Sequence, residues 1–166
     1  MSKGELIPRE LAEQQGILFL LYMKPYLKNR LICGSIRRKE PMVGDIDIVL
    51  VPKYNEGDQL LRAISDFSDK GLTSGTGNRN VLFTKEGMPF NVMIVKEEDF
   101  ESATLHFTGS KAFNIKCRVM AKTRTGWKLN EYGLWKGNKR IAKTELGILE
   151  CIHMEQFIDP ITRSFK

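Results

Sequence analysis

The segment from Gly44 to Pro52 constrains the fold of this chain more than any other. It reads Gly-Asp-Ile-Asp-Ile-Val-Leu-Val-Pro, and alternate side chains of an extended strand point to opposite faces of a sheet. Asp45 and Asp47 therefore share one face, about 6.6 Å apart along the strand, while Ile46 and Ile48 share the other. Two like charges on one face repel, so the pattern favours a bound divalent cation.

The segment just upstream has the composition of an anion site. Residues 29–34 have the apolar character of a short buried strand, which ends at Gly34 and is followed by Ser35 and Arg38. Glycine lets backbone N–H groups approach an anion, and the start of a helix adds unpaired donors. A serine hydroxyl and an arginine complete a phosphate cradle. An anion cradle beside a cation site indicates nucleotidyl transfer; the alternatives are a simple turn and a solvated strand face.

Length and composition indicate a globular protein with a real core. The chain has 166 residues and 42% hydrophobic side chains, which suits one domain or two small lobes. The apolar run at 16–23 is too short for a membrane span, and the N-terminus lacks a signal-peptide pattern. We expect a soluble, intracellular monomer that does not bind membranes. The odd number of cysteines, among apolar neighbours, favours reduced thiols over disulfides or zinc.

Basic residues are concentrated in the segment 108–143. It holds ten basic side chains against one acidic residue, Glu131. Such a concentration predicts a surface for a polyanion, whereas a solvated helix face would have acids among the bases. The basic residues are Lys111, Lys116, Arg118, Lys122, Arg124, Lys128, Lys136, Lys139, Arg140 and Lys143.

Periodicity and turn residues predict an α+β fold. Helices are expected over 8–24, 59–69, 108–122 and 144–151, strands over 29–34, 45–52, 81–84 and 90–95, a hairpin over 126–141, and loops over 54–58 and 73–80. In the third helix Lys111, Asn114 and Arg118 share one face, and Phe113 and Cys117 share another. We expect a mixed sheet with helices on one side and a smaller lobe starting near residue 108.

Five motifs occur in the order found in DNA polymerase family X, which the chain resembles from about Ile7 to near its C-terminus. The resemblance implies a nucleotidyltransferase palm at 1–107 and a small α/β thumb at 108–166, as in the minimal viral members. The motifs are Gly34-Ser-x-Arg-Arg38, Gly44-Asp-Ile-Asp47, Leu105-His-Phe-Thr-Gly-Ser110, Asn114-x-x-x-Arg118 and Leu129-Asn-Glu-Tyr132.

The resemblance also implies an activity and a set of site residues. It implies a template-directed DNA polymerase that fills short gaps in DNA repair and uses dNTPs and primer-template or gapped DNA. Asp45 and Asp47 would bridge two Mg²⁺ ions, for which Mn²⁺ could substitute. The implied nucleotide-binding residues are Gly34, Ser35, Arg38, Gly44, His106, Phe107, Gly109, Lys111 and Asn114. The implied DNA-binding residues are Lys116, Arg118, Lys122, Arg124, Lys128, Glu131 and Tyr132.

The sequence departs from the family pattern at its third catalytic carboxylate. Where the family has an aspartate that binds metal with Asp45 and Asp47, this chain has Asn91. An amide offers a metal one neutral oxygen and is no base near neutral pH. Asn91 should therefore weaken one metal and slow catalysis, whether it is natural or engineered. Two smaller departures are Lys111, where an acid is usual, and His106, where a tyrosine is usual.

Two other functions remain open. A minimal nucleotidyltransferase that copies no template would share the Gly-Ser and Asp-x-Asp motifs, although it would not need the basic helix. A catalytically silent DNA-binding module would account for Asn91. Primer extension on a one-nucleotide gap separates these functions, because they differ in whether the product is templated, untemplated or absent.

Overall fold

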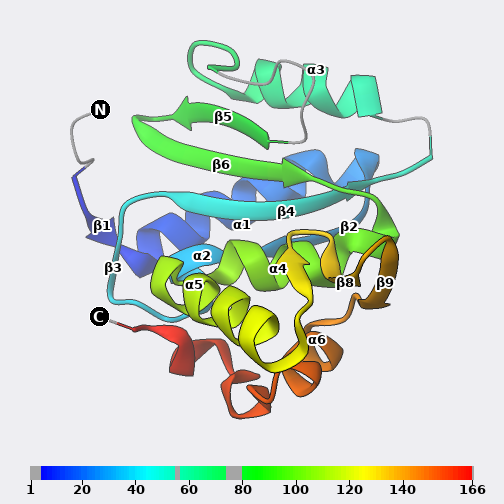
Figure 1. Cartoon of the computed structure of the whole chain (residues 1–166). Coiled ribbons are helices and arrows are strands. Elements are labelled where there is room, and N and C mark those ends of the chain that lie inside the picture. Colours follow the sequence, from blue (N-terminus) through cyan, green and yellow to red (C-terminus); the bar gives the residue numbers. More distant parts are fainter. Residues whose placement is uncertain (1–4, 55–56, 74–79, 166) are drawn as a thin grey trace.

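A four-stranded mixed sheet forms the centre of the molecule (Figure 1). The computed structural model describes residues 5–54, 57–73 and 80–165. The strand order is β2 (Leu27–Ile32), β4 (Ile46–Pro52), β6 (Met88–Ile94) and β5 (Asn80–Lys85). The central strands β4 and β6 run parallel, whereas both outer pairs are antiparallel. The predicted α+β class and mixed sheet are confirmed.

Helices cover both faces of this sheet. On one face α1 (Arg9–Met23) and α3 (Gly57–Phe67) pack on a core that includes Ile46, Ile48 and Leu50. On the other face α4 (Phe100–Thr108) packs on Val49 and Val51. Figure 1 shows α1 behind the sheet and α4 in front of it. The prediction of helices on one side only is wrong, because the apolar run of β4 is typical of a strand buried on both faces.

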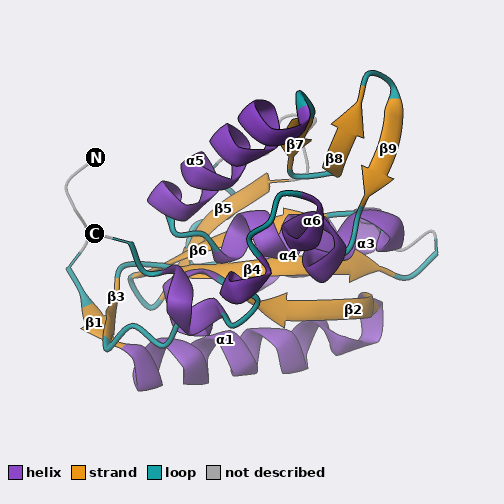
Figure 2. Ribbon diagram, turned by 60° about the horizontal axis from the view of Figure 1, so that its bottom comes forward, coloured by secondary structure: helices purple, strands orange, loops and turns teal. Residues whose placement is uncertain are grey.

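The C-terminal third forms a second hydrophobic cluster. Helix α5 (Lys111–Met120) continues as a π-helical turn at Ala121–Thr125 and leads into an antiparallel sheet of three strands, where the sequence predicted a simple hairpin. Figure 2 shows this sheet beside α5. The strands are β7 (Lys128–Asn130), β8 (Gly133–Lys136) and β9 (Lys139–Ala142), and helix α6 (Glu145–Cys151) follows them.

The remaining elements are short. Strands β1 (Ile7–Pro8) and β3 (Met42–Val43) pair beside the start of α1, and α2 (Gly34–Arg37) follows β2 directly. Of the predicted loops, residues 55–56 and 74–79 lie outside the described part of the chain. The predicted cap of the last helix is confirmed, because the Thr144 hydroxyl accepts a hydrogen bond from the Gly147 N–H at 3.1 Å. Among the described helices, none has the length and apolar character needed to cross a membrane.

Candidate active site

Gly34 brings the start of α2 against the strand that carries the carboxylates. Its φ of +58° lies in the left-handed region that glycine adopts readily. A Cβ at this position would lie 2.1 Å from Asp47 Oδ2, so no side chain fits. The preceding Cys33 N–H also donates to the Asp47 carbonyl at 2.7 Å. The Gly-Ser motif therefore places the helix start directly beside Asp47.

Asp47 and Asn91 face each other across the parallel strands β4 and β6. They are register partners, and Asn91 Nδ2 donates to Asp47 Oδ1 at 2.9 Å. Burial raises the pKa of Asp47 to about 7, and the charge of Asp45 adds to this, while the hydrogen bond from Asn91 and the charge of Arg38 oppose it. Partial burial also raises the pKa of Asp45, and Arg38 again opposes the shift. We call Asp45, Asp47 and Asn91 the carboxylate corner.

The carboxylate corner opens into a cleft of about 510 Å³, here called the active-site cleft. The sheet contributes Asp47 and Asn91, and Arg38 comes from the position directly after α2. The remaining lining comes from α4, the connection after it, and α5, so the cleft joins the two halves of the chain. These residues are His106, Phe107, Gly109, Ser110, Lys111, Asn114, Ile115 and Arg118.

Two buried polar atoms beside this cleft lack a hydrogen-bond partner among the described residues. They are Ser35 Oγ and Arg38 Nε. The Arg38 guanidinium donates to the Thr108 carbonyl through its other end, and burial lowers its pKa, although Glu40, Asp47 and Asp45 oppose this. A buried polar atom without a partner costs about 1–3 kcal/mol, so such atoms call for an explanation. Arg38 Nε also lies 3.9 Å from Glu40 Oε1, and a phosphate is a ligand whose acceptor oxygens suit donors of this kind.

The opposite wall of the cleft is organised around His106. Asn114 Nδ2 donates to its carbonyl at 2.7 Å, and Arg118 Nη2 lies 3.4 Å from its Nδ1. Burial lowers the pKa of His106, and the charge of Arg118 lowers it further, although Glu131 opposes this. The imidazole is therefore neutral near pH 7. Ser110 caps α5 by accepting from the Phe113 N–H at 3.3 Å, and the Gly109–Ser110 peptide bond is cis.

The donor set of the carboxylate corner fits a hard divalent cation only in part. Carboxylate oxygens are the ligands that Mg²⁺ prefers. The described residues nevertheless contain no group of three His, Cys, Asp or Glu side chains that could hold a metal. The third position is Asn91, and its amide nitrogen faces Asp47. Asp45 and Asp47 could thus hold a metal with Asn91 as a weaker neighbour.

The predicted DNA-binding residues are not all on one surface. Arg118 lines the active-site cleft, whereas the Lys116 ammonium lies over the rings of Phe157 and Phe165, 5.2 and 4.8 Å from their centroids. Glu131 and Tyr132 form the turn between β7 and β8 and are partly buried. The remaining three are exposed along the π-helical turn and the start of β7; they are Lys122, Arg124 and Lys128.

A second set of buried charges lies close to the cleft, and sequence reasoning missed it. The Arg37 guanidinium donates to Thr108 Oγ1 at 2.8 Å and to both Glu145 oxygens, at 3.0 and 2.8 Å. The fully buried Arg163 donates to Glu145 Oε1 at 2.7 Å. Burial alone would raise the pKa of Glu145, but the hydrogen bond from Arg37 and the charge of Arg163 outweigh it, so that this pKa is lowered. We call Arg37, Glu145 and Arg163 the Glu145 network.

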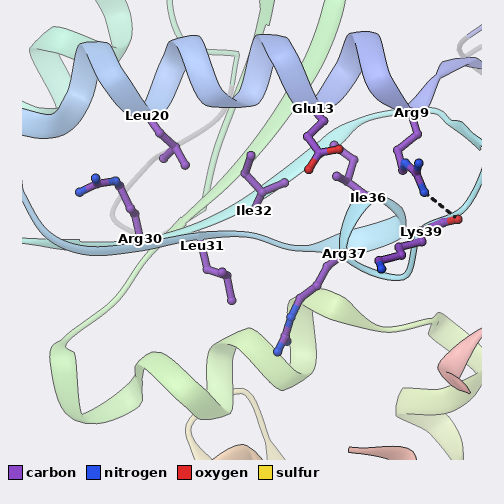
Figure 3. Close-up of a pocket in the computed structure, with 9 residues that line it drawn as sticks. All are labelled: Arg9, Glu13, Leu20, Arg30, Leu31, Ile32, Ile36, Arg37 and Lys39. Atoms are coloured by element: carbon purple, nitrogen blue, oxygen red, sulfur yellow. Dashed lines mark hydrogen bonds between the residues drawn. The ribbon is translucent and has the colours of Figure 1, made fainter. Parts of the chain in front are cut away.

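A separate hollow of about 570 Å³ lies between α1 and β2 (Figure 3). It shares no lining residue with the active-site cleft. In Figure 3 Glu13 and Leu20 extend from α1 toward β2, whereas Arg37 points away from the hollow toward α4. This hollow and the active-site cleft are therefore lined by different residues.

Comparison with known proteins gives similarity to one group of polymerases. The model of the DNA polymerase beta thumb matches residues 103–164. Two proteins named Repair DNA polymerase X, from different isolates of African swine fever virus, are 34% identical over 115 residues and 32% identical over 116 residues. In both cases the match covers 66% of this chain and 65% of the relative, so the chain spans less than two thirds of their length. The Bacillus subtilis DNA polymerase/3'-5' exonuclease PolX is 35% identical over 104 residues, which cover 61% of this chain and 18% of the bacterial protein.

Proposed function

We propose that this chain, which belongs to DNA polymerase family X, is a template-directed DNA polymerase that adds dNTPs to a primer 3′-hydroxyl in short gaps. One observation carries the proposal: the active-site cleft joins Asp47, Asn91 and Arg38 of the sheet side to Asn114 and Arg118 of α5. A nucleotide held between metal-binding carboxylates and a basic helix is what phosphoryl transfer to DNA needs. The relatives named Repair DNA polymerase X support a role in DNA repair.

Asp45 and Asp47 are the residues that would hold Mg²⁺ in this proposal. The bound metal would neutralise charge that develops on the phosphate oxygens. Burial and, to a smaller extent, the charge of Asp45 raise the pKa of Asp47 to about 7. Mn²⁺ also prefers oxygen ligands and is the expected substitute.

The phosphate groups of the nucleotide would lie at the start of α2. Ser35 Oγ and Arg38 Nε are buried and have no hydrogen-bond partner among the described residues, although Arg38 Nε lies 3.9 Å from Glu40 Oε1, and they are the donors that a triphosphate would engage. The backbone at Gly34 and Gly44 would add N–H donors. On the opposite wall, the sugar and base would contact residues of α4 and α5: His106, Phe107, Gly109, Lys111 and Asn114.

The DNA would lie along the exposed part of the basic segment. Arg118 at the cleft and the exposed Lys122, Arg124 and Lys128 are the proposed phosphate contacts. Binding should therefore weaken steeply as salt rises. A division into a palm at 1–107 and a thumb at 108–166 accompanies this proposal. Leu105 packs in the second hydrophobic cluster, which suggests that the packing boundary falls a few residues earlier than the motif boundary.

Asn91 would make this polymerase slower than one with a complete set of carboxylates. Its amide cannot accept the proton of the primer hydroxyl, and its N–H already engages Asp47. Loss of a general base typically costs about 10²–10⁴-fold in rate. Asn91 is also compatible with the alternative function, in which the chain binds gapped DNA and has very little polymerase activity.

Primer extension on a one-nucleotide gap tests the proposal, with the unchanged chain compared with Asn91→Asp. We expect template-matched incorporation that requires Mg²⁺ and rises at least about tenfold in Asn91→Asp. Asn29→Asp is the matched control, because it adds the same charge at an exposed position of β2 and should change nothing. Untemplated addition would support the transferase alternative, and tight binding of gapped DNA without product in either variant would support the binding module.

A further inference from the structure

The outward face of α1 carries an apolar stripe. Surface helices normally present polar side chains to solvent, and a helix that is apolar on all sides is usually covered. Here five large apolar side chains of one helix are each about half exposed. They are Leu11 at 53%, Ile17 at 48%, Leu18 at 54%, Leu21 at 59% and Tyr22 at 51%. We call these residues the α1 stripe.

Apart from Tyr22, whose ring lies 5.4 Å from that of Phe67, the α1 stripe lies outside the core that α1 already serves. Its inward face is complete, because Ala12, Phe19 and Met23 are fully buried against the sheet. Glu13 and Leu20 point toward the hollow beside β2, as Figure 3 shows. Figure 2 shows α1 at one edge of the molecule, with the sheet on one side and no other described element beyond it. An apolar surface of this kind marks an interaction site.

The spacing along the stripe fits a second copy of the same helix. Leu11, Gln14, Leu18 and Leu21 follow each other at intervals of three, four and three residues, the spacing at which facing helices interlock. In an antiparallel pair centred near residue 16, Leu11 of one copy lies against Leu21 of the other. Gln14 then lies against Leu18, and the two Ile17 side chains approach each other beside the two-fold axis.

The charges that flank the stripe are complementary in the same arrangement. Glu10 and Lys24 are both exposed and lie at opposite ends of the helix. An antiparallel pair places Glu10 of each copy near Lys24 of the other, whereas a parallel pair would bring like charges together. The Glu10 carboxylate also contacts the neighbouring Arg9 at 2.8 Å, and this contact leaves it at the surface. The charge pattern therefore favours self-association in one orientation.

We propose that two copies of this chain associate through antiparallel packing of their α1 helices. The sequence-based expectation of a monomer took no account of this face. The surface is smaller than a standard stable interface, so the dimer is weak, with a Kd of about 1–100 µM. The proposal does not depend on the polymerase activity.

Sedimentation velocity over a concentration series from about 1 µM to 1 mM tests the association. We expect a reversible monomer–dimer equilibrium that Leu18→Lys weakens at least about a hundredfold, because the change enters the interface twice. Gln14→Leu should tighten it about tenfold. Leu146→Lys is the matched control, since Leu146 is 46% exposed on α6 and far along the chain. A monomer at every concentration, or a dimer that Leu18→Lys leaves intact, overturns the proposal.

Charge exchange distinguishes self-association in this orientation from other arrangements. Glu10→Lys and Lys24→Glu should each weaken the dimer by about three- to tenfold, because each creates two like-charge contacts. The double variant Glu10→Lys with Lys24→Glu should restore the original Kd, and salt should reduce all of these differences. If the two changes weaken association independently, without rescue, the antiparallel arrangement is wrong.

Cysteine cross-linking tests the register. Cys33 and Cys117 are buried and Cys151 is partly exposed, so the experiment uses Cys151→Ser as background. In that background, oxidation of Ile17→Cys should give a covalent dimer. Leu11→Cys alone should not, because its two copies would lie about 15 Å apart along the paired helices. Cross-linking through Leu11→Cys but not Ile17→Cys would overturn the proposed register.

Discussion

The carboxylate corner and the Glu145 network are two groups of buried charge with opposite character. In the Glu145 network every charge is met by an opposite charge: Arg37 and Arg163 both donate to Glu145, and its pKa is lowered. In the carboxylate corner two like charges lie together, and the pKa of Asp47 is raised to about 7. In the first arrangement two arginines stabilise one carboxylate, whereas in the second the charge of Arg38 only partly offsets the raised pKa values of two carboxylates.

The two groups of charge meet at α2, where one arginine makes structural contacts and the next lines the active-site cleft. The last residue of α2 and the residue after it face different ways: Arg37 contacts Thr108 and Glu145, while Arg38 lines the active-site cleft. Arg37 therefore joins the end of α2 to α4 and α6. Arg38 Nε is buried without a hydrogen-bond partner among the described residues and lies 3.9 Å from Glu40 Oε1. The hydrogen bonds of Arg37 to Thr108 and Glu145 hold α2 in place. They thereby also position the neighbouring Ser35 and Arg38, which have donor atoms without a hydrogen-bond partner among the described residues.

The largest expected effect comes from breaking the saturated group. Glu145→Gln removes the only carboxylate that meets Arg163 and Arg37 in the described network, and Arg163 is fully buried. Removing one partner of a buried ion pair typically costs about 3–5 kcal/mol. Urea unfolding should show this loss in the free energy of unfolding at pH 7. Glu150→Gln, an exposed position of the same helix, should change stability by less than about 0.5 kcal/mol.

The pH dependence of that loss checks its cause. The pKa of folded Glu145 lies below its usual value of 4.5, so the stability it contributes is present above that value and disappears as the pH falls through the lowered pKa. The difference between Glu145→Gln and the unchanged chain should thus shrink as the pH falls below about 4.5. A difference that stays constant down to pH 3 would mean that shape, rather than charge, carries the effect.

A smaller effect of opposite sign is expected at the carboxylate corner. The pKa of Asp47 is raised from its usual 3.8 to about 7, so the folded state loses stability as the pH rises between these values. In the presence of EDTA, Asp47→Asn should therefore stabilise the fold at pH 8, by about 1–3 kcal/mol, and change little at pH 4. Asp66→Asn, on the exposed side of α3, is the control for removing one negative charge. Destabilisation by Asp47→Asn at pH 8 would show that ionised Asp47 does not destabilise the folded state.

Much of the sheet could be predicted from the sequence because its signals are local. Alternation in β4 correctly separated Asp47 from Ile46 and Ile48, and both Ile residues are fully buried. The helix at 144–151 and its Thr144 cap followed from a known start signal. By contrast, α4 was missed: its threonine, histidine and phenylalanine residues are modest helix formers, and the helix depends on packing against β4.

The missed parts of the site are those that depend on distant partners. Arg37 and Glu145 are separated by 108 positions, and no local pattern pairs them. Lys116 was assigned to DNA from its charge, but its ammonium lies over two aromatic rings contributed by the C-terminal segment. The pairing of Asp47 with Asn91 likewise depends on two strands meeting in parallel register. Charge and spacing identified candidates, and only the fold shows which of them meet.

The smallest expected effect tests whether the carboxylate corner binds a divalent cation. A metal that binds only the folded state raises its stability by an amount set by concentration and affinity, about 1–2 kcal/mol at ten to thirty times Kd. Mg²⁺ or Mn²⁺ should raise the Tm of the unchanged chain slightly at pH 8, and not at all in Asp47→Asn. Asn91→Asp should enlarge the shift, because a third carboxylate strengthens the site while its repulsion lowers the Tm of the metal-free protein. Glu145→Gln should show the same metal-induced shift from a lower starting Tm, because its network is saturated without metal. Equal Tm shifts in the unchanged chain and in Asp47→Asn would show that the metal binds elsewhere. The carboxylate corner would then bind metal no better than the Glu145 network.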